Sequence, residues 1–251
     1  MDLAEATWTD ADAAETDLAV LPVGSTEQHG PHAPLGTDVL TAEAVAAAGA
    51  ESYEADHGSP VVVAPAIPVG VAAEHRQFTG TLWVGEDTFR DYVRETVESL
   101  ASHGFDRVVV VNGHGGNVAP LREVCGRVTR ESDAYAVPFT WFDAVDPADH
   151  GVEMGHGGPV ETSVLRHLAP ALVREDRLDA AAEGGADRWG EWLGGTNLAY
   201  DTAEFSENGT VGDPREGSAD LGEALFDAAT GALVDLLSRV ADREGGTPPH
   251  R

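Results

Sequence analysis

The feature that most constrains the fold is a run of four consecutive valines within residues 107–112. A strand this uniformly apolar is typical of a parallel sheet that is covered on both faces. Three other short apolar segments also read as strands, namely Leu18–Val23, Val61–Ala64 and Ala134–Phe139. We therefore expect a parallel sheet at the centre of the molecule.

Helical spacing of apolar residues appears between and after these strands. It predicts helices over residues 41–53, 87–102 (with Asp87 as the N-cap), 117–130, 161–168 and 218–243, the last one stopped by Gly245 and Gly246. Strands that alternate with helices predict an α/β fold with crossover helices. Residues 180–214 are rich in glycine and lack periodicity, so we expect a long loop there. Nothing divides the chain, which predicts one domain over residues 1–251.

The charge balance excludes several partners. The chain has 15 basic residues, all of them arginine, against 44 acidic residues, which gives a net charge of −29. Nucleic acid and anionic membranes need a basic patch, and the arginines are spread singly along the chain. Such an excess of carboxylates fits a halophilic source, and stability is then expected to rise with added salt.

Other features of the chain point to a cytoplasmic, soluble protein. The single cysteine, Cys125, excludes an intrachain disulfide, and its helical, apolar surroundings predict a buried thiol. Residues 1–17 are acidic and lack the apolar core of a signal peptide. No apolar run approaches the length needed to cross a bilayer.

The first cluster of chemically useful residues follows the strand at Leu18–Val23. In an extended loop, Glu27 and His29 would point to the same side, and Asp38 could return to the same point from the start of the next helix. Oxygen and nitrogen donors together suit a divalent metal such as Zn²⁺ or Mn²⁺. A surface loop with Asp38 as a capping residue is the alternative.

The second cluster follows the valine strand. His114 lies between glycines, which let the backbone approach a ligand closely. A histidine satisfied within a turn is one alternative, and a phosphate site at the start of the next helix is another. The chain has no lysine and no Gly-x-Gly-x-x-Gly motif, so a nucleotide cofactor is not expected.

These blocks resemble the creatininase family. The resemblance lies in residues 24–38, which include Glu-Gln-His-Gly-Pro-His, in Asn-Gly-His-Gly-Gly-Asn at 112–117, and in the segment from His156 to Glu-Thr-Ser at 161–163. Softer matches at 74–81 and 209–214 extend the likeness over nearly the whole chain. The resemblance implies a three-layer α/β/α sandwich around a mostly parallel sheet, and a homo-oligomer, commonly a hexamer.

The resemblance also implies a site with two divalent metal ions, zinc, manganese or iron. By match of motif, Glu27 and His114 would ligate one ion, His29 the other, and Asp38 both. His156 matches the family's catalytic histidine and would act as the acid that protonates the leaving nitrogen.

Two positions depart from the creatininase pattern. Gly116 stands where creatininase has a ligating glutamate, and we expect Glu161 to replace that ligand. Pro159 stands where glutamate is more usual. Residues that could contact the substrate are His32, His75, Gly115, Gly116 and Asn117.

The resemblance implies a hydrolase that cuts a non-peptide C–N bond of a small amide. Creatinine is disfavoured because Gly115 and Gly116 replace bulkier residues and Val152 stands where creatininase has tryptophan. The preferred substrate is a formylaminopyrimidine ribonucleotide, an intermediate of flavin and deazaflavin synthesis. The alternatives are creatinine amidohydrolase, a peptide-maturation endopeptidase of the same family, and a non-catalytic metal-binding protein.

Overall fold

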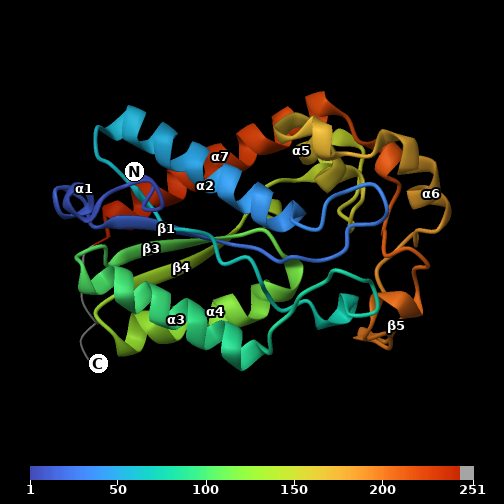
Figure 1. The fold of residues 1–251 in the computed structure, drawn as a ribbon, viewed down its shortest axis with the longest axis horizontal. Helices are drawn as coiled ribbons and strands as arrows, with labels where there is room; N and C mark the ends of the chain where they lie inside the picture. The colour runs from blue at the N-terminus through green and yellow to red at the C-terminus, as the bar shows by residue number, and fades with distance from the viewer. Residues whose placement is uncertain (244–251) are drawn as a thin grey trace.

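The computed structural model describes residues 1–243, and its centre is a parallel sheet with the strand order β2-β1-β3-β4 (Figure 1). The strands are β1 (Leu18–Val23), β2 (Val62–Val63), β3 (Arg107–Asn112) and β4 (Tyr135–Thr140). A separate hairpin pairs β5 (Trp192–Leu193) with β6 (Thr196–Asn197). The four predicted strands are confirmed, with ends that shift by at most one residue.

The register of the sheet brings the loops of two strands together. β1 pairs with β3 along its full length, from Leu18 opposite Arg107 to Val23 opposite Asn112. Both strands therefore end at the same level. The loops that follow them, which hold the first and second sequence clusters, leave from the same edge of the sheet.

Helices cover both faces of the sheet, which confirms the predicted three-layer sandwich. The helices are α1 (Trp8–Asp12), α2 (Thr37–His57), α3 (Glu86–Ser102), α4 (Val118–Glu131), α5 (Pro159–Leu168), α6 (Leu178–Glu183) and α7 (Ala219–Ala241). In Figure 1, α2 and α7 lie on one side of the sheet and α3 and α4 on the other, while α5 packs along α7. In the described residues, no helix is long and apolar enough to cross a membrane.

Short 3₁₀ helices lie in the connections. They are η1 (Ala73–His75), η2 (Gly115–Asn117), η3 (Trp141–Asp143), η4 (Pro147–His150), η5 (Pro170–Leu172), η6 (Glu175–Arg177), η7 (Thr202–Glu204) and η8 (Pro214–Glu216). Most of them follow the carboxyl ends of the strands, where the chain makes its longest connections.

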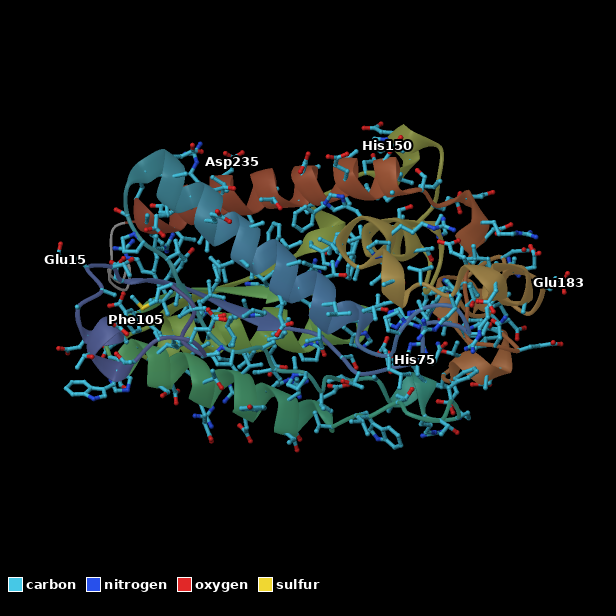
Figure 2. All side chains as sticks on the ribbon, turned by 45° about the horizontal axis from the view of Figure 1, so that its top comes forward. Glu15, His75, Phe105, His150, Glu183 and Asp235 are labelled. Carbon is cyan, nitrogen blue, oxygen red and sulfur yellow. The ribbon has the colours of Figure 1, made fainter. Side chains whose placement is uncertain are left out.

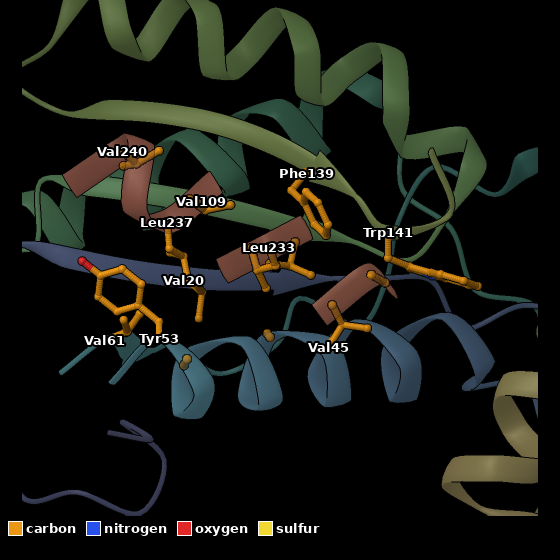
Figure 3. Packing of buried hydrophobic residues seen from close by; sticks show 14 of the residues in the cluster. Val20, Val45, Tyr53, Val61, Val109, Phe139, Trp141, Leu233, Leu237 and Val240 are labelled. Atoms are coloured by element: carbon orange, nitrogen blue, oxygen red, sulfur yellow. The ribbon is translucent and has the colours of Figure 1, made fainter. Parts of the chain in front are cut away.

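Alternate residues of the strands build two cores. Val20 and Val109 face α2 and α7, where they pack against Leu233 and Leu237 (Figure 3). Their neighbours Leu21 and Val110, like Cys125, belong to the core under α3 and α4. Because both sides of each strand are buried, the valine run needs no polar face. The thiol of Cys125 is buried, as predicted.

The structure differs from the sequence predictions at several boundaries. α2 begins at Thr37, four residues early, after a Gly36 N-cap that carries no capping side chain. The N-cap of α3 is Gly85, so the predicted cap Asp87 lies within the first turn. The segment 180–214 is mostly irregular, but it includes most of α6 and the β5–β6 hairpin, which are too short to show a period. The predicted stop at 245–246 lies outside the described residues.

Candidate metal centre

Glu27 and His29 converge as the loop pattern predicted. Both side chains are fully buried in the loop after β1, while Asp38 enters from the first turn of α2 and is 2% exposed. His114 comes from the end of β3. Burial of so many ionisable groups at the carboxyl edge of the sheet is costly unless they are paired or bound to a cation.

Three histidines of the site share one arrangement, in which one ring nitrogen donates to a main-chain carbonyl. His29 donates from Nδ1 to the carbonyl of Glu27 (3.1 Å), and His114 donates from Nε2 to that of Val71 (2.7 Å). His156 donates from Nε2 to the carbonyl of the residue after Glu27 (2.5 Å). These bonds place one N–H of each ring against a carbonyl, so the other nitrogen of each ring faces the carboxylates and is the one that could ligate a metal ion. The same support orients histidine ligands in known metal sites.

The ring nitrogens that face the site lie close to the carboxylate oxygens. Nε2 of His29 is 3.0 Å from Oδ1 of Asp38 and 3.6 Å from Oε1 of Glu161. Nδ1 of His114 is 3.1 Å from Oε1 of Glu27 and 3.4 Å from Oδ2 of Asp38. Three groups have ligand atoms close enough to share one ion: Glu27 with Asp38 and His114, His29 with Asp38 and Glu161, and Glu27 with His29 and His156.

Several of these buried atoms have no hydrogen-bond partner. They include both carboxylate oxygens of Glu27, Oδ2 of Asp38 and Nε2 of His29. A buried polar atom without a partner is costly, and four of them in one cluster fit a bound cation that they all face. The donor set of imidazole and carboxylate suits zinc, manganese or iron.

The electrostatics of the protein without metal agree with this interpretation. Burial opposes a charge on His114, but Glu27, Asp38 and Glu74 outweigh it and raise the pKa to about 10. His29 behaves likewise, because Asp38 and Glu161 raise its pKa well above the usual value in spite of burial. Protons thus take the place of metal ions in balancing the carboxylates.

Glu161 brings to the site a carboxylate that Gly116 cannot provide. A Cβ at Gly116 would be 2.1 Å from the carbonyl oxygen of Val71, so this position has no room for a side chain. Glu161 in the first turn of α5 reaches His29 instead, and its Oε2 accepts from the N–H of Gly157 (2.6 Å). Pro159 occupies the first turn of α5, where a missing N–H costs nothing, which explains this departure.

The amide of Gln28 fixes the proton of His75. Oε1 of Gln28 accepts from the N–H of Gly30 (2.9 Å), and its Nε2 donates to the carbonyl of Gly209 (3.0 Å), so the amide has one possible orientation. The same Nε2 lies 2.8 Å from Nδ1 of His75, which must therefore accept. The proton of His75 therefore sits on Nε2, which lies 3.4 Å from Oε1 of Glu27, and a nitrogen that carries a proton is not available as a metal ligand.

Two of the predicted substrate contacts lie elsewhere. His32 is fully buried and bonds through Nε2 to the hydroxyl of Thr162 (2.9 Å), one residue after Glu161. Asn117 is fully buried as well; its amide accepts from Val71 (3.0 Å) and donates to the carbonyl of Gly24 (3.1 Å). Both residues therefore support loops of the site and do not reach its cavity.

The other predicted contacts open onto a cavity of about 370 Å³. His75, Gly115 and Gly116 line it, together with Asp38, His114, His156 and Glu161. Figure 2 places His75 among the loops toward one end of the molecule and Phe105, which precedes β3, toward the other. The site thus lies beyond the carboxyl ends of the strands, as expected for an α/β sheet.

Sequence reasoning missed four residues of the cavity wall. Glu74, Phe142, Met154 and Trp189 line the cavity, and Trp189 lies edge-on to His75 and to His156, with ring centroids 5.9 and 5.8 Å apart. Glu74 could have been predicted, because it directly precedes His75, which was already expected to contact the substrate. The tryptophan lies in a glycine-rich stretch without periodicity, and its approach depends on how residues 180–214 fold back.

Comparisons with known proteins agree with the fold and the site. The family model described as "Creatininase: Creatinine amidohydrolase" matches residues 4–237. The chain is 37% identical over 230 residues to the mycofactocin precursor peptide peptidase of Mycolicibacterium smegmatis, covering 91% of this chain and 87% of that protein. It is 28% identical to the creatinine amidohydrolase of Pseudomonas putida, covering 93% and 94%. A solved structure described as "Creatininase Mn" matches with a TM-score of 0.81 and 26% identity, covering 96% of this chain and 99% of that chain.

Proposed function

Because the chain belongs to the creatininase family, we propose that it is a metal-dependent hydrolase that cleaves an amide bond of a peptide during the maturation of that peptide. The observation that carries the reaction class is the buried cluster of imidazole nitrogens and unpartnered carboxylate oxygens at the wall of a cavity. The substrate class is supported by the similarity to a precursor peptide peptidase, which is greater than that to the creatinine amidohydrolase.

We assign two ion positions to the cluster. Glu27, Asp38 and His114 would hold one ion, and His29, Asp38 and Glu161 the other, so that Asp38 belongs to both. When bound, such ions activate a water molecule and stabilise the charge that develops on a carbonyl oxygen.

The protein's own groups handle the proton. His156 stands at the cavity wall with Nδ1 free and 3.8 Å from Oε1 of Glu27. Burial and the nearby charge of His29 lower its pKa to about 4, so the ring is neutral at pH 7. A neutral ring accepts the proton of the attacking water at Nδ1 and then gives it to the leaving nitrogen. Its bond to the loop carbonyl holds the ring in this orientation.

His75 contributes a fixed hydrogen-bond donor. Its ring stacks on His156 with centroids 4.3 Å apart and an interplanar angle of 17°, and Nε2–H points toward Glu27. Burial and the nearby His156 lower the pKa of His75 far below its usual value, so it stays neutral. We propose that His75 orients the carboxylate of Glu27 and contacts the carbonyl of the substrate.

The earlier preference for a formylaminopyrimidine nucleotide has no feature of the cavity in its favour. Its phosphate would meet Glu74, Glu161 and a protein of charge −29, and no arginine lines this cavity. A peptide bond carries no charge of its own and meets no such repulsion. Formamide hydrolysis stays a prediction that the same assay tests.

The test is a side-by-side assay of the protein supplied with Mn²⁺, Fe²⁺ or Zn²⁺ in high salt. The substrates are the mycofactocin precursor peptide, creatinine and a panel of formamides. We expect mass spectrometry to find new peptide termini, and we expect cleavage to disappear in the His156→Ala variant, which controls for contaminating proteases. Release of formate, or opening of the creatinine ring, with an intact peptide would overturn the proposal.

A further inference from the structure

A second, larger cavity continues from the metal cavity. It measures about 710 Å³, against about 370 Å³ for the inner one, and the two share Met154, Gly155 and Trp189. We name it the outer groove and define it by residues 151–155, 185–189 and 211–213, with Arg215 and Glu216. Trp189 is 38% exposed and Met154 39%, so these apolar side chains stand at the passage between the cavities.

The walls of the outer groove are irregular chain with free main-chain groups. Val211 bridges to His156 on one side and to Ala186 on the other. Because the first bridge is antiparallel and the second is parallel, residues 153–155 and residues 187–188 both lie toward the chain that follows Val211. Among the described residues, the main-chain N–H and C=O groups of both segments make no hydrogen bond.

Unpaired main chain beside a catalytic cavity is what an extended peptide recognises. A strand added to such an edge gains main-chain hydrogen bonds, and pockets beside the edge select its side chains. The metal cavity has room for the bond to be cut and its neighbours, whereas a small amide would leave the outer groove unused.

Charge further defines the occupant. Glu153, Asp187 and Glu216 line the groove, and none of them has an ion-pair partner among residues 1–243. Arg215 is already paired with Asp213 at 2.7 Å, which leaves Arg188 as the opposing charge. The groove is therefore acidic and disfavours an acidic peptide segment.

We infer that the outer groove binds an extended, uncharged or basic segment of the peptide substrate, several residues away from the bond that is cut. This inference rests on the proposed peptidase function. It adds the path that the substrate chain takes after it leaves the metal cavity. It makes substrate length a determinant of the rate.

The experiment uses nested synthetic peptides that share one scissile bond and grow by one residue at a time on either side. We expect kcat/KM to rise at least about tenfold between a tripeptide and a nonapeptide, chiefly through KM. The Ala186→Trp variant narrows the groove and should abolish this dependence on length. Ala228→Trp, on the exposed face of α7, is the matched control and should keep it.

A charge variant tests the groove without altering its width. Asp187→Lys should reduce the preference for a basic over an acidic segment at least about threefold. The exposed Asp227→Lys, which changes the net charge equally, should not. Equal cleavage of all lengths, or equal effects of each variant and its control, would overturn the groove assignment alone. Failure to cleave any peptide would overturn the peptidase function and the groove with it.

Discussion

Nε2 of His29 lies 3.0 Å from Oδ1 of Asp38, with both side chains buried. Nδ1–H of the same ring is held by the carbonyl of Glu27, so this short contact is imposed by the loop and not by chance rotation. On its other oxygen, Asp38 approaches His114 at 3.4 Å. One carboxylate thus stands between two histidines, which is the geometry that a pair of ions with a shared ligand requires.

His156 should be needed for turnover and not for metal. It enters only one of the three candidate ligand groups, and that group lacks Asp38. His156→Ala is expected to lower kcat by about 10²–10⁴, the range for loss of a general acid or base. Elemental analysis should find the same metal content as in the parent protein.

The control for this prediction is His103→Ala, which removes an exposed histidine at the end of α3. It should leave both kcat and metal content unchanged. Full activity in His156→Ala, or loss of metal together with activity, would show that the role assigned to His156 is wrong.

Metal binding should release protons near neutral pH. In the protein without metal, His114 has a pKa of about 10, so its ring is protonated at pH 8, and the carboxylates of Asp38 and Glu161 raise the pKa of His29 as well. A ligand nitrogen must carry no proton, so metal binding should release at least about one proton, from His114. The affinity for metal should therefore rise as the pH rises, and fall in acid.

Calorimetric titration of Zn²⁺ in HEPES and in Tris at pH 8 measures this release. The two buffers take up protons with different enthalpies, so the observed binding enthalpies should differ in proportion to the protons released. Identical enthalpies in both buffers would mean that the histidines are already neutral before metal binds.

The packing of α5 against α7 should control both stability and the site. A Cβ at Gly222 of α7 would lie 1.9 Å from the carbonyl oxygen of Ser163 in α5. Gly222→Ala is expected to lower the free energy of unfolding by about 1–3 kcal/mol, as overpacked cores do. Because Glu161 lies in the first turn of α5, the same variant should bind metal more weakly.

Gly231→Ala is the matched control on the same helix, since no atom lies within 4 Å of a Cβ there. It should raise the free energy of unfolding by up to about 1 kcal/mol, because alanine restricts the unfolded chain. Urea unfolding curves measure both. Similar effects of the two substitutions would contradict the close packing of α5 on α7.

Much of the fold was predictable because its signals are local. The valine run marks β3, and apolar residues at helical spacing mark α3, α4 and α7 within a few residues. Boundaries were less predictable where no side chain provides the cap, as at Gly36 and Gly85. Elements of two to six residues, such as β5 and α6, are too short to show a period.

The site was predictable only where the spacing of residues along the chain decides which side chains meet. Glu27 and His29 converge because extended residues two apart share a side. The loop contacts of Asn117 were not predictable, because its amide bonds to loops 46 and 93 residues away in the sequence. The approach of Trp189 to His156 likewise depends on long-range packing, which no local pattern reports.

The most direct test of the account is the number of metal ions per chain in the parent protein and in Asp38→Asn, measured by elemental analysis after dialysis against Zn²⁺ or Mn²⁺. Asp87→Asn is the control, because Asp87 also lies in the first turn of a helix but is fully exposed. The account predicts two ions per chain in the parent and the control, and fewer than one in Asp38→Asn. Two ions retained in Asp38→Asn, or none in the parent, would contradict it.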